Sequence, residues 1–458
     1  MRVMRAVRLG CALVGALASA VVLIGPGIGS AAVHSPAGSG SAGSGPGSVL
    51  WTSVRAGDGH AVAADPRGGM VFVAGSTGLV AYDAGTGAKV WDNSKGSGRS
   101  VAVSPGGHVV FVIKPVRTSG GTWDFSTAAF DAATGKQLWA RRYNGRANGA
   151  DRPAALAVSP GGGTVFVTGT SQGKSSGRDY ATVAYKATTG KQLWASRYNG
   201  HSNGTDTAVA VAVSPRGGAV FVTGSSLGRK SFDFATVAYA AATGASLWTK
   251  RYNGPANGAD EASSVAASQD GHRVFVTGAS KGNSGFDFAT VAYAATAGAP
   301  LWVRRYHGPT DRQDTPAVVL VSPLGGGTVV VSGDSRGNLA AYVSVAYSTV
   351  TGRTKWVARF HEGLEEVLNA AALSPDGGSI YLTGSDCLVC GGEEPDEAFT
   401  FAAKVATGAE IWRKVVTTDR PNQDGRSVAM SPDGGTVYVV IEDFTDVAHD
   451  FTTVTFRA

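Results

Sequence analysis

Short apolar runs separated by turn residues recur along most of the chain. Clusters of Pro, Gly and Ala-Thr-Gly mark the turns, and no helical periodicity accompanies the runs. In one unit the predicted strands are Val209–Val213, Val220–Gly224, Phe234–Tyr239 and a fourth that carries Leu247-Trp248. The second of these runs is apolar at every position but its last two, which is typical of a buried strand. The pattern predicts units of four short strands.

This unit repeats. Residues 193–248 and 247–302 match almost position for position. The tryptophans that mark the repeat are Trp51, Trp91, Trp139, Trp194, Trp248, Trp302, Trp356 and Trp412. Four strands in each of several units of about fifty residues indicate a radial array, the β-propeller.

The number of blades follows from counting strands. First strands occur eight times, but the chain stops after a third strand, Asp450–Phe456. The missing fourth strand lies at the other end of the sequence, in Ser48–Trp51. We therefore expect an all-β, eight-bladed β-propeller of four-stranded antiparallel blades, closed by the N-terminal strand. Seven blades are the alternative, if the short unit Trp51–Trp91 does not form a full blade.

The start of the chain has the pattern of an export signal. Three arginines precede the apolar run Leu9–Ile24, and Ser30-Ala31-Ala32 supplies the small residues of a cleavage site. We expect a signal peptide at 1–32, a Gly/Ser/Pro-rich linker at 33–47 and the propeller at 48–458. An uncleaved membrane anchor is the alternative, although the apolar run is short for one. The protein is therefore expected to be secreted or held in the cell envelope.

Composition narrows the range of partners. A hydrophobic content of 43 % excludes global disorder. The net charge of +6 includes the three arginines of the signal, which leaves about +3 on the mature chain and argues against a nucleic-acid partner. No long apolar stretch follows residue 24, so the mature chain has no predicted transmembrane segment. We expect a monomer.

Two cysteines remain after export, Cys387 and Cys390. In an oxidising compartment such neighbours usually pair, so a disulfide that closes this loop is expected. A redox-active pair and half of a zinc site are the alternatives, although no helix and no second ligand pair accompany them.

One set of acidic residues recurs at the start of the predicted innermost strands. It consists of Asp151, Asp206, Asp260, Asp314, Glu366 and Asp424. These residues are our ligand-face candidates, because carboxylates pooled around a central channel could hold a cation such as Ca²⁺ or receive a cationic ligand. The alternative is local, since an Asp after Asn-Gly can accept backbone N–H bonds and fix its loop.

Other recurring residues have simpler interpretations. A second set of acids opens the third strands, on the same face as a set of arginines three residues past the tryptophans. This predicts repeated ion pairs, and a polar rim that binds ligands is the alternative. These acids are Asp124, Asp179, Asp233, Asp287, Glu397 and Asp450, and the arginines are Arg142, Arg197, Arg251, Arg305 and Arg359. A G-x-S-x-G pattern occurs four times, at 169–173, 224–228, 278–282 and 333–337, where we expect a turn whose glycine adopts positive φ rather than a nucleophile elbow.

Departures from the repeat are more informative about function than the repeat itself. They fall at Cys387–Glu397, at Lys114–Thr122 and at His361–Glu366. Loops on a rigid scaffold often carry function, so if a specific partner exists it is expected on the face that these loops share, and sequence drift without function is the alternative. None of the eight histidines has the spacing of a metal-ligand motif.

The third-to-fourth-strand hairpin Asp131–Trp139 resembles that of PQQ-like (quinoprotein-type) propeller repeats, which are typically eight-bladed. The stretch RYNGxxNGxDxAxxxAVSPxGGxVFVTG is similar to the SBBP-type repeat of secreted bacterial proteins. The resemblance implies the fold for about 410 residues. It does not extend to the quinoprotein site, because those enzymes carry adjacent cysteines whereas two residues separate Cys387 from Cys390.

We therefore expect an exported, non-catalytic propeller that acts as a binding or scaffold module for a protein, polysaccharide or cell-surface ligand. The alternative is an exported propeller enzyme, a PQQ-like oxidoreductase, lyase or hydrolase, with its site at the channel mouth. No catalytic residue, metal site or cofactor is predicted, and Ca²⁺ or PQQ belongs to the alternative only.

Overall fold

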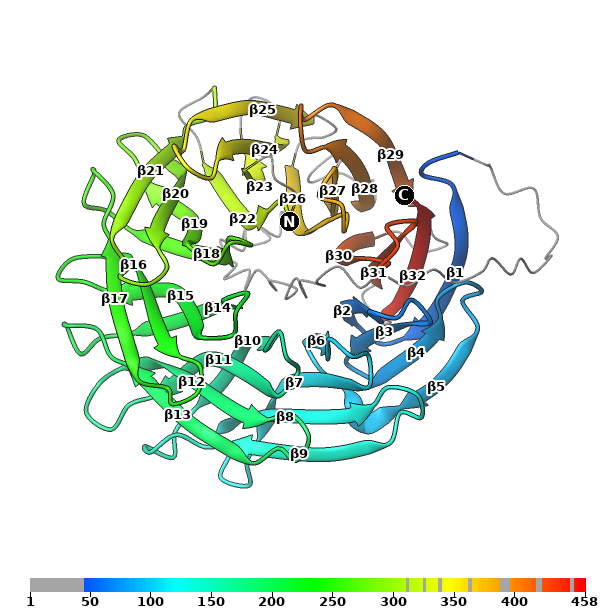
Figure 1. Cartoon of the computed structure of the whole chain (residues 1–458), viewed down its shortest axis with the longest axis horizontal. Helices are drawn as coiled ribbons and strands as arrows, with labels where there is room; N and C mark the ends of the chain where they lie inside the picture. Colours follow the sequence, from blue (N-terminus) through cyan, green and yellow to red (C-terminus); the bar gives the residue numbers. More distant parts are fainter. Residues whose placement is uncertain are drawn as a thin grey trace, which may run out of the picture.

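Eight four-stranded antiparallel sheets are arranged around a common axis (Figure 1). The computed structural model describes residues 45–309, 313–323, 327–336, 340–360, 365–387, 396–416, 422–444 and 449–458. Each sheet is one blade, with its first strand next to the axis and its last strand at the rim. The expected eight-bladed propeller is confirmed, and the short first unit forms a full blade, so seven blades are excluded.

The strands of blades 1 to 4, from axis to rim, have the following bounds. Blade 1 holds β2 (Gly59–Ala64), β3 (Met70–Gly75), β4 (Leu79–Asp83) and β5 (Lys89–Asn93). Blade 2 holds β6 (Ser100–Val103), β7 (Val109–Arg117), β8 (Trp123–Asp131) and β9 (Gln137–Tyr143). Blade 3 holds β10 (Asp151–Val158), β11 (Thr164–Gln172), β12 (Arg178–Lys186) and β13 (Gln192–Tyr198). Blade 4 holds β14 (Asp206–Val213), β15 (Ala219–Leu227), β16 (Phe232–Ala240) and β17 (Ser246–Tyr252).

Blades 5 to 8 follow in the same order. Blade 5 holds β18 (Asp260–Ala267), β19 (Arg273–Lys281), β20 (Phe286–Ala294) and β21 (Pro300–Tyr306). Blade 6 holds β22 (Asp314–Val321), β23 (Thr328–Ser335), β24 (Ala341–Ser348) and β25 (Thr354–Phe360). Blade 7 holds β26 (Glu365–Leu373), β27 (Ser379–Cys387), β28 (Asp396–Lys404) and β29 (Glu410–Val416). Blade 8 holds β30 (Asn422–Met430), β31 (Thr436–Phe444), β32 (His449–Arg457) and β1 (Val49–Ala56), and a 3₁₀ turn η1 (Ser94–Gly96) is the one helical element in the described ranges.

The two ends of the described chain meet in blade 8. There β1 pairs antiparallel with β32, as the count of strands predicted, and Figure 1 shows the blue strand beside the red one. The Trp51 backbone N–H donates to Thr455 Oγ1 at 3.1 Å. Because the ring is closed in this way, no blade is left with three strands.

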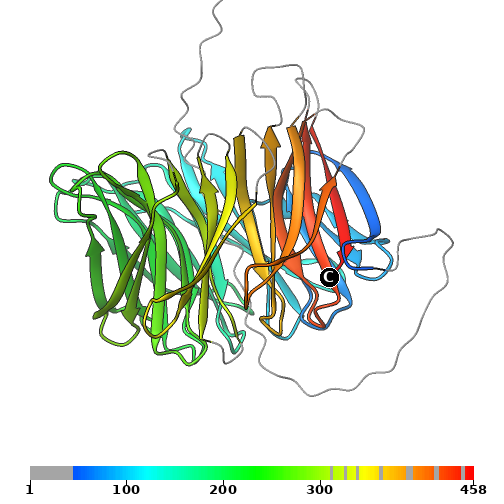
Figure 2. The same ribbon diagram turned by 90° about the horizontal axis from the view of Figure 1, so that it is seen from above.

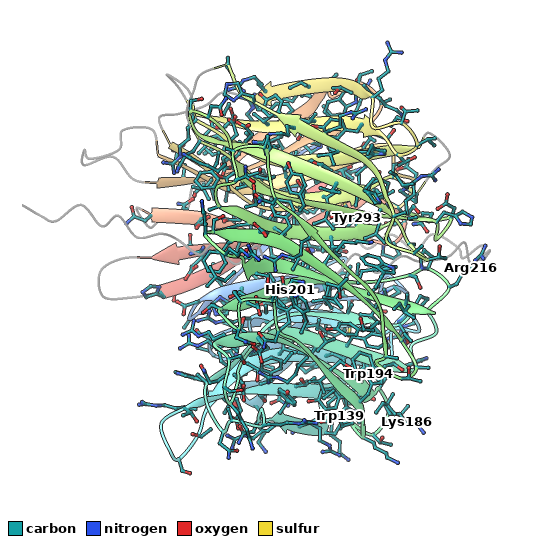
Figure 3. All side chains as sticks on the ribbon, turned by 90° about the vertical axis from the view of Figure 1, so that its left-hand side faces the viewer. Trp139, Lys186, Trp194, His201, Arg216 and Tyr293 are labelled. Carbon is teal, nitrogen blue, oxygen red and sulfur yellow. The ribbon has the colours of Figure 1, made fainter. Side chains whose placement is uncertain are left out.

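Tryptophans of the outer strands join each blade to the next. The Trp139 indole N–H donates to the Ala187 carbonyl at 2.8 Å, and the Trp194 indole N–H to the Ala241 carbonyl at 2.8 Å. Figure 3 shows Trp139 close to Lys186, the last residue of β12 in the following blade. The same bond recurs from Trp51, Trp91, Trp248, Trp302 and Trp356. The tryptophan spacing thus marks inter-blade contacts.

A glycine covers each of these indoles. Gly298 adopts φ 65°, and a Cβ there would lie 2.7 Å from Trp248 Cδ2. A residue with a side chain would therefore be strained in its backbone and would overlap the ring. The Thr-Gly or Ala-Gly of the hairpin turns is required by this contact.

The G-x-S-x-G pattern ends second strands with no helix after it, but the expected reason for its first glycine is wrong. Gly224 lies inside β15 and is not among the glycines of positive φ. A Cβ on it would lie 1.9 Å from the Thr207 carbonyl oxygen of β14. The glycine is needed because β14 bulges between Ala208 and Ala210 and brings its backbone close.

Strands run between the two faces of the ring (Figure 2). We call the face at which β10, β14, β18 and β22 begin the acid face. The loops that join outer strands to the next inner strand lie on it, as does the loop between the second and third strands of each blade. The described residues contain no helix long and apolar enough to span a membrane.

Candidate functional site

The acids predicted to open the innermost strands do so in blades 3 to 6. Asp151, Asp206, Asp260 and Asp314 are the first residues of their strands, and all four are fully buried. In each, Oδ2 accepts the backbone N–H of the glycine six residues earlier. The four distances, from Gly145, Gly200, Gly254 and Gly308, are 2.6, 2.6, 2.7 and 2.6 Å. This is the loop-fixing geometry of the local alternative.

An arginine and a serine complete the surroundings of each acid. In blade 4, Arg251 donates to Ser226 Oγ at 2.5 Å and to Asp233 Oδ2 at 2.8 Å. Its Nη1 also donates to the Tyr198 hydroxyl of blade 3 at 3.2 Å. The predicted ion pairs are thus confirmed in blades 2 to 5, with N–O distances of 2.9, 2.7, 2.8 and 2.6 Å.

Burial of these carboxylates is electrostatically unfavourable. Desolvation raises the pKa of Asp206, and the Gly200 N–H opposes the rise by donating to the ionised form. Desolvation is also the largest cause that raises the pKa values of Asp151, Asp260 and Asp314. Acids held in this way build the acid face, and the proposal that they contact a ligand stays a prediction.

Of the remaining two candidates, Glu366 keeps the register and Asp424 does not. Glu366 is buried and lies two residues before Leu368, the last paired residue before the bulge, as Asp206 lies two before Ala208, although β26 begins one residue earlier. Asp424 is the third residue of β30 and lies one position later in register. Asp424 Oδ1 accepts from Asn369 Nδ2 at 2.5 Å, and its Oδ2 pairs with Arg426 Nη1 at 3.0 Å. The acid of blade 8 therefore contacts an asparagine of blade 7 and an arginine of its own strand, whereas the acids of blades 3 to 6 have no such neighbours at these positions.

These side chains occupy one special position, which the sequence analysis missed. Each inner strand except β6 contains a bulge, where one residue has no partner in the second strand. In blades 3 to 6 this residue is small or apolar: Ala154, Val209, Ser263 and Ala317. In blades 7, 8 and 1 it is Asn369, Arg426 and His60. Bulges re-aim side chains, so at this level the ring has one side with large polar residues and another with small or apolar ones.

We call the connected polar group on these blades the polar arc. It comprises Asp58, His60, Asn369, Asp424, Arg426, Glu442 and His449. Arg426 Nε donates to Glu442 Oε2 at 2.5 Å, and His449 Nδ1 lies 3.0 Å from Asp58 Oδ1 and 3.8 Å from Glu442 Oε1. The arc therefore runs from blade 7 through blade 8 to blade 1.

Charge and burial differ along the arc. Burial lowers the pKa of His60, and the charges of Arg99 and Arg426 lower it further against the attraction of Asp58. Burial also lowers the pKa of Arg426, but Asp424 and Glu442 more than offset it, so the net direction is upward. The side chain of Glu442 is 10 % exposed whereas that of His449 is 51 % exposed. The arc thus has a buried base and an accessible rim.

Two groups of side chains are close enough to share one ion. They are Asp58, Glu442 and His449 in the arc, and Asp287, His307 and Asp314 between blades 5 and 6. Neither was found from sequence spacing, because their members come from different strands or blades. Each group offers two carboxylates and one imidazole, and a paired arginine, Arg426 or Arg305, lies beside it.

The two groups do not offer the ligand set that calcium prefers. Calcium takes six to eight oxygen ligands, whereas each group in the described residues supplies one imidazole and two carboxylates, one of which is already paired with an arginine. The expected disulfide between Cys387 and Cys390 stays a prediction, because Cys390 lies outside the described residues.

The fold and the acid face define the class: an all-β propeller of eight PQQ-like blades joined by tryptophans. The sequence belongs to the family described as outer membrane protein assembly factor BamB, a family of PQQ-like propeller repeats. The family model matches residues 42–228, 178–359 and 233–442, which overlap to span nearly the whole ring. No curated protein matches the chain.

Solved structures resemble the ring at low identity. The quinohemoprotein alcohol dehydrogenase of Comamonas testosteroni matches with a TM-score of 0.56 and 14 % identity, over 89 % of this chain and 76 % of the enzyme. A second quinohemoprotein alcohol dehydrogenase, ADHIIG of Pseudomonas putida HK5, matches with a TM-score of 0.57 and 13 % identity. The match covers 89 % of this chain and 76 % of the enzyme. Chaetomium thermophilum Sqt1, solved bound to the N-terminus of ribosomal protein L10, matches with a TM-score of 0.57 and 13 % identity. The match covers 88 % of this chain and 97 % of Sqt1. These likenesses show the fold alone.

Proposed function

We propose that this chain is an exported, non-catalytic propeller that binds a partner through the polar arc and acts as a binding or scaffold module of the cell envelope. The observation that carries the proposal is the change of chemistry at the bulge position. Seven inner strands share the bulge, but only three of them place Asn, Arg and His there. If the bulge residue served only to stabilise the fold, we would expect the small or apolar residues of blades 3 to 6 in all seven strands.

The accessible rim of the arc suits recognition of a polar partner. Asp58 and His449 have side-chain exposures of 34 % and 51 %, so both can reach a partner. Glu442, which is buried, accepts from Arg426, whose side chain is 37 % exposed, so a fixed ion pair adjoins the rim. Membership of the BamB-type family supports a scaffold role, and the export signal predicted at 1–32 supports an envelope location.

The test compares capture by matched variants. The mature chain, residues 33–458, is immobilised and exposed to envelope extract of the producing organism. Asp58→Asn with His449→Gln alters the rim and keeps its shape, and Glu261→Gln is the control, an exposed acid on the inner strand of blade 5. We expect one partner to be retained by the parent and the control and lost from the double variant. Equal retention by all three, or no retained partner, would overturn the proposal.

A second measurement separates binding from quinoprotein catalysis. The melting temperature of the mature chain is measured alone and with Ca²⁺ plus PQQ. A ligand at a hundred times its Kd adds about 2.7 kcal/mol to the folded state, which is readily seen. We expect no rise. A clear rise would contradict the non-catalytic proposal and favour the enzyme alternative.

A further inference from the structure

Blade 2 differs from the other blades on the side that faces the axis. Its inner strand β6 has four residues, whereas β14 of blade 4 has eight. Gly96-Ser97-Gly98 stands where blade 4 has Asp206 and its neighbours. A Cβ on Gly98 would lie 1.9 Å from Val112 Cγ1, so the chain passes too close to β7 for a larger residue. The inner strand of blade 2 therefore begins only at Ser100, four residues after the position that corresponds to Asp206.

As a result, the second half of β7 lacks its inner neighbour. β6 pairs with β7 only over Val110–Ile113, and Lys114–Arg117 pair on one side only, with β8. The last backbone bond on the inner side runs from the Arg99 N–H to the Ile113 carbonyl. Because backbone groups alternate along a strand, those of Pro115 and Arg117 point to this uncovered side. Proline has no N–H to leave unpaired, which suits this edge.

The uncovered edge carries a lysine where blades 3 to 6 place the buried acid with its serine and arginine. When β7 is aligned with β15 by its pairing to the inner strand, Lys114 takes the position of Gly224, where no Cβ fits in blade 4. Val116 takes the position of Ser226. Lys114 is half-buried, and its Nζ donates to Ser97 Oγ at 2.5 Å. Burial is the cause that lowers the pKa of Lys114, and no carboxylate offsets it.

More cations lie at the two ends of the edge Lys114–Arg117, since the Arg99 N–H bonds to Ile113 and Trp123 pairs with Arg117. Arg99 is exposed at the start of β6 and close enough to His60 of blade 1 to lower its pKa. On the other side, the Arg152 guanidinium of blade 3 lies 5.5 Å from the ring centroid of Trp123. Asp124 Oδ2 pairs with Arg142, and Asp151 Oδ2 accepts the Gly145 N–H, while the Oδ1 atom of each acid is buried without a hydrogen-bond partner in the described part of the chain. Neither Lys114 nor Arg99 forms an ion pair with a carboxylate of the described residues, so both cations are available to an external anion.

We propose that the uncovered edge of β7 binds an oxyanion group, a carboxylate or a phosphate, carried by a ligand. The Lys114 ammonium, the Ser97 hydroxyl and the Arg99 guanidinium are all hydrogen-bond donors, and charge-assisted bonds to an oxyanion would satisfy them. Arg152 and Trp123 form the flank next to blade 3. The site shares no residue with the polar arc, although Arg99 lies close enough to His60 of the arc to lower its pKa. The inference goes beyond the proposed function, and its test uses other residues and other ligands, so the two can fail independently.

The test is calorimetric titration of the mature chain with citrate and, separately, with inorganic phosphate, each against sodium chloride of equal ionic strength. Lys114→Met removes the charge and keeps the apolar stem, and Lys114→Arg restores a cation. Lys355→Met is the matched control, because Lys355 of blade 6 also donates to a hydroxyl, Thr328 Oγ1, at 2.7 Å. Circular dichroism and thermal melting verify that each variant is folded.

We expect at least one of the two anions to bind the parent, and Lys114→Met to weaken its binding by about tenfold or more, as loss of a charge-assisted contact would. Arg99→Gln should weaken it several-fold, whereas Lys114→Arg and Lys355→Met should stay near the parent. Tighter citrate binding would identify a carboxylate ligand, and tighter phosphate binding a phosphate ester. Failure of both anions to bind, or unchanged binding by Lys114→Met, would overturn the proposal.

Discussion

At the scale of single residues, the molecule uses buried carboxylates as structural acceptors. Asp206 is fully buried, and its Oδ2 accepts the Gly200 N–H beside the Ser226–Arg251 pair. The recurrence of this acid in the sequence indicated its importance and left loop and ligand roles open. Spacing could not distinguish them, because both roles place an acid at the same end of the same strand.

The raised pKa of Asp206 makes a prediction about pH. A carboxyl whose folded-state pKa is raised binds protons more readily when folded, so its contribution to stability falls as pH rises from the unfolded value, about 3.9, through the folded value. Asp206→Asn mimics the protonated form. We expect its stability relative to the parent to increase over this range and then level off, as measured by urea unfolding at a series of pH values.

Asp376 provides a control of opposite sign. The Ser374 hydroxyl and the Gly378 N–H donate to its carboxylate and lower its pKa. Asp376→Asn should therefore lose stability relative to the parent as pH rises through the same acidic region. Parallel trends in the two variants would contradict the assignment of Asp206 as a desolvated acid.

Glycine at the tryptophan contact makes a second prediction at this scale. Gly298→Ala should destabilise the protein by about 1–2 kcal/mol or more, because positive φ strains alanine and the new methyl meets the Trp248 ring. Gly218→Ala is the control, since a Cβ there meets no atom within 4 Å. Chemical denaturation measures both. Equal effects would show that the indole contact does not require the glycine.

At the scale of the strands, hydroxyl pairs link the second and third strands of the blades. Thr223 Oγ1 lies 3.0 Å from Thr236 Oγ1 in the buried interior of blade 4, and it also donates to the Ala235 carbonyl at 3.2 Å. Equivalent pairs occur at 168 with 182, 277 with 290, 332 with 344 and 383 with 400. Each pair satisfies polar groups that would otherwise be buried without partners.

A double-mutant cycle tests this coupling. Thr223→Val leaves the Thr236 hydroxyl without the partner described here, so it should cost about 1–3 kcal/mol of unfolding free energy. The double change to valine should cost less than the sum of the two single changes, because no orphaned hydroxyl remains. Additive costs, measured by denaturant unfolding, would mean that the pair is not coupled.

The strands also show where sequence reasoning reached its limit. Tryptophan spacing and turn residues predicted the strands, their order and the closing strand, because each signal is local. The polar arc was missed, since it appears only when bulge residues such as Val209 and Arg426 are aligned by their distance from the end of the inner strand. The short β6 could have been suspected from Gly96 and Gly98, but its effect on β7 depends on strand register.

At the scale of the whole molecule, stability depends on a contact between strands at opposite ends of the ring's sequence. Trp51 of β1 is buried against Tyr82 of blade 1 and Tyr438 of blade 8, with ring centroids 5.8 and 6.4 Å apart. A chain that begins at Gly57 would lack β1 and leave β32 unpaired on one side. Compared with residues 33–458, we expect the shortened chain to lose several kcal/mol, at least the ~3–5 kcal/mol of removing one buried tryptophan, and to melt at a much lower temperature. Equal melting temperatures would show that the eighth blade is complete without β1.

The pairing of β1 with β32 also orders events during synthesis. Trp51 and Thr455 are 404 positions apart, so the N-terminal strand emerges from the ribosome long before its partner exists. Middle blades can form from neighbouring segments, but blade 8 needs the last residues of the chain, and contacts of such long separation form slowly. Until β32 has been synthesised, the ring stays open and β1 has no partner strand.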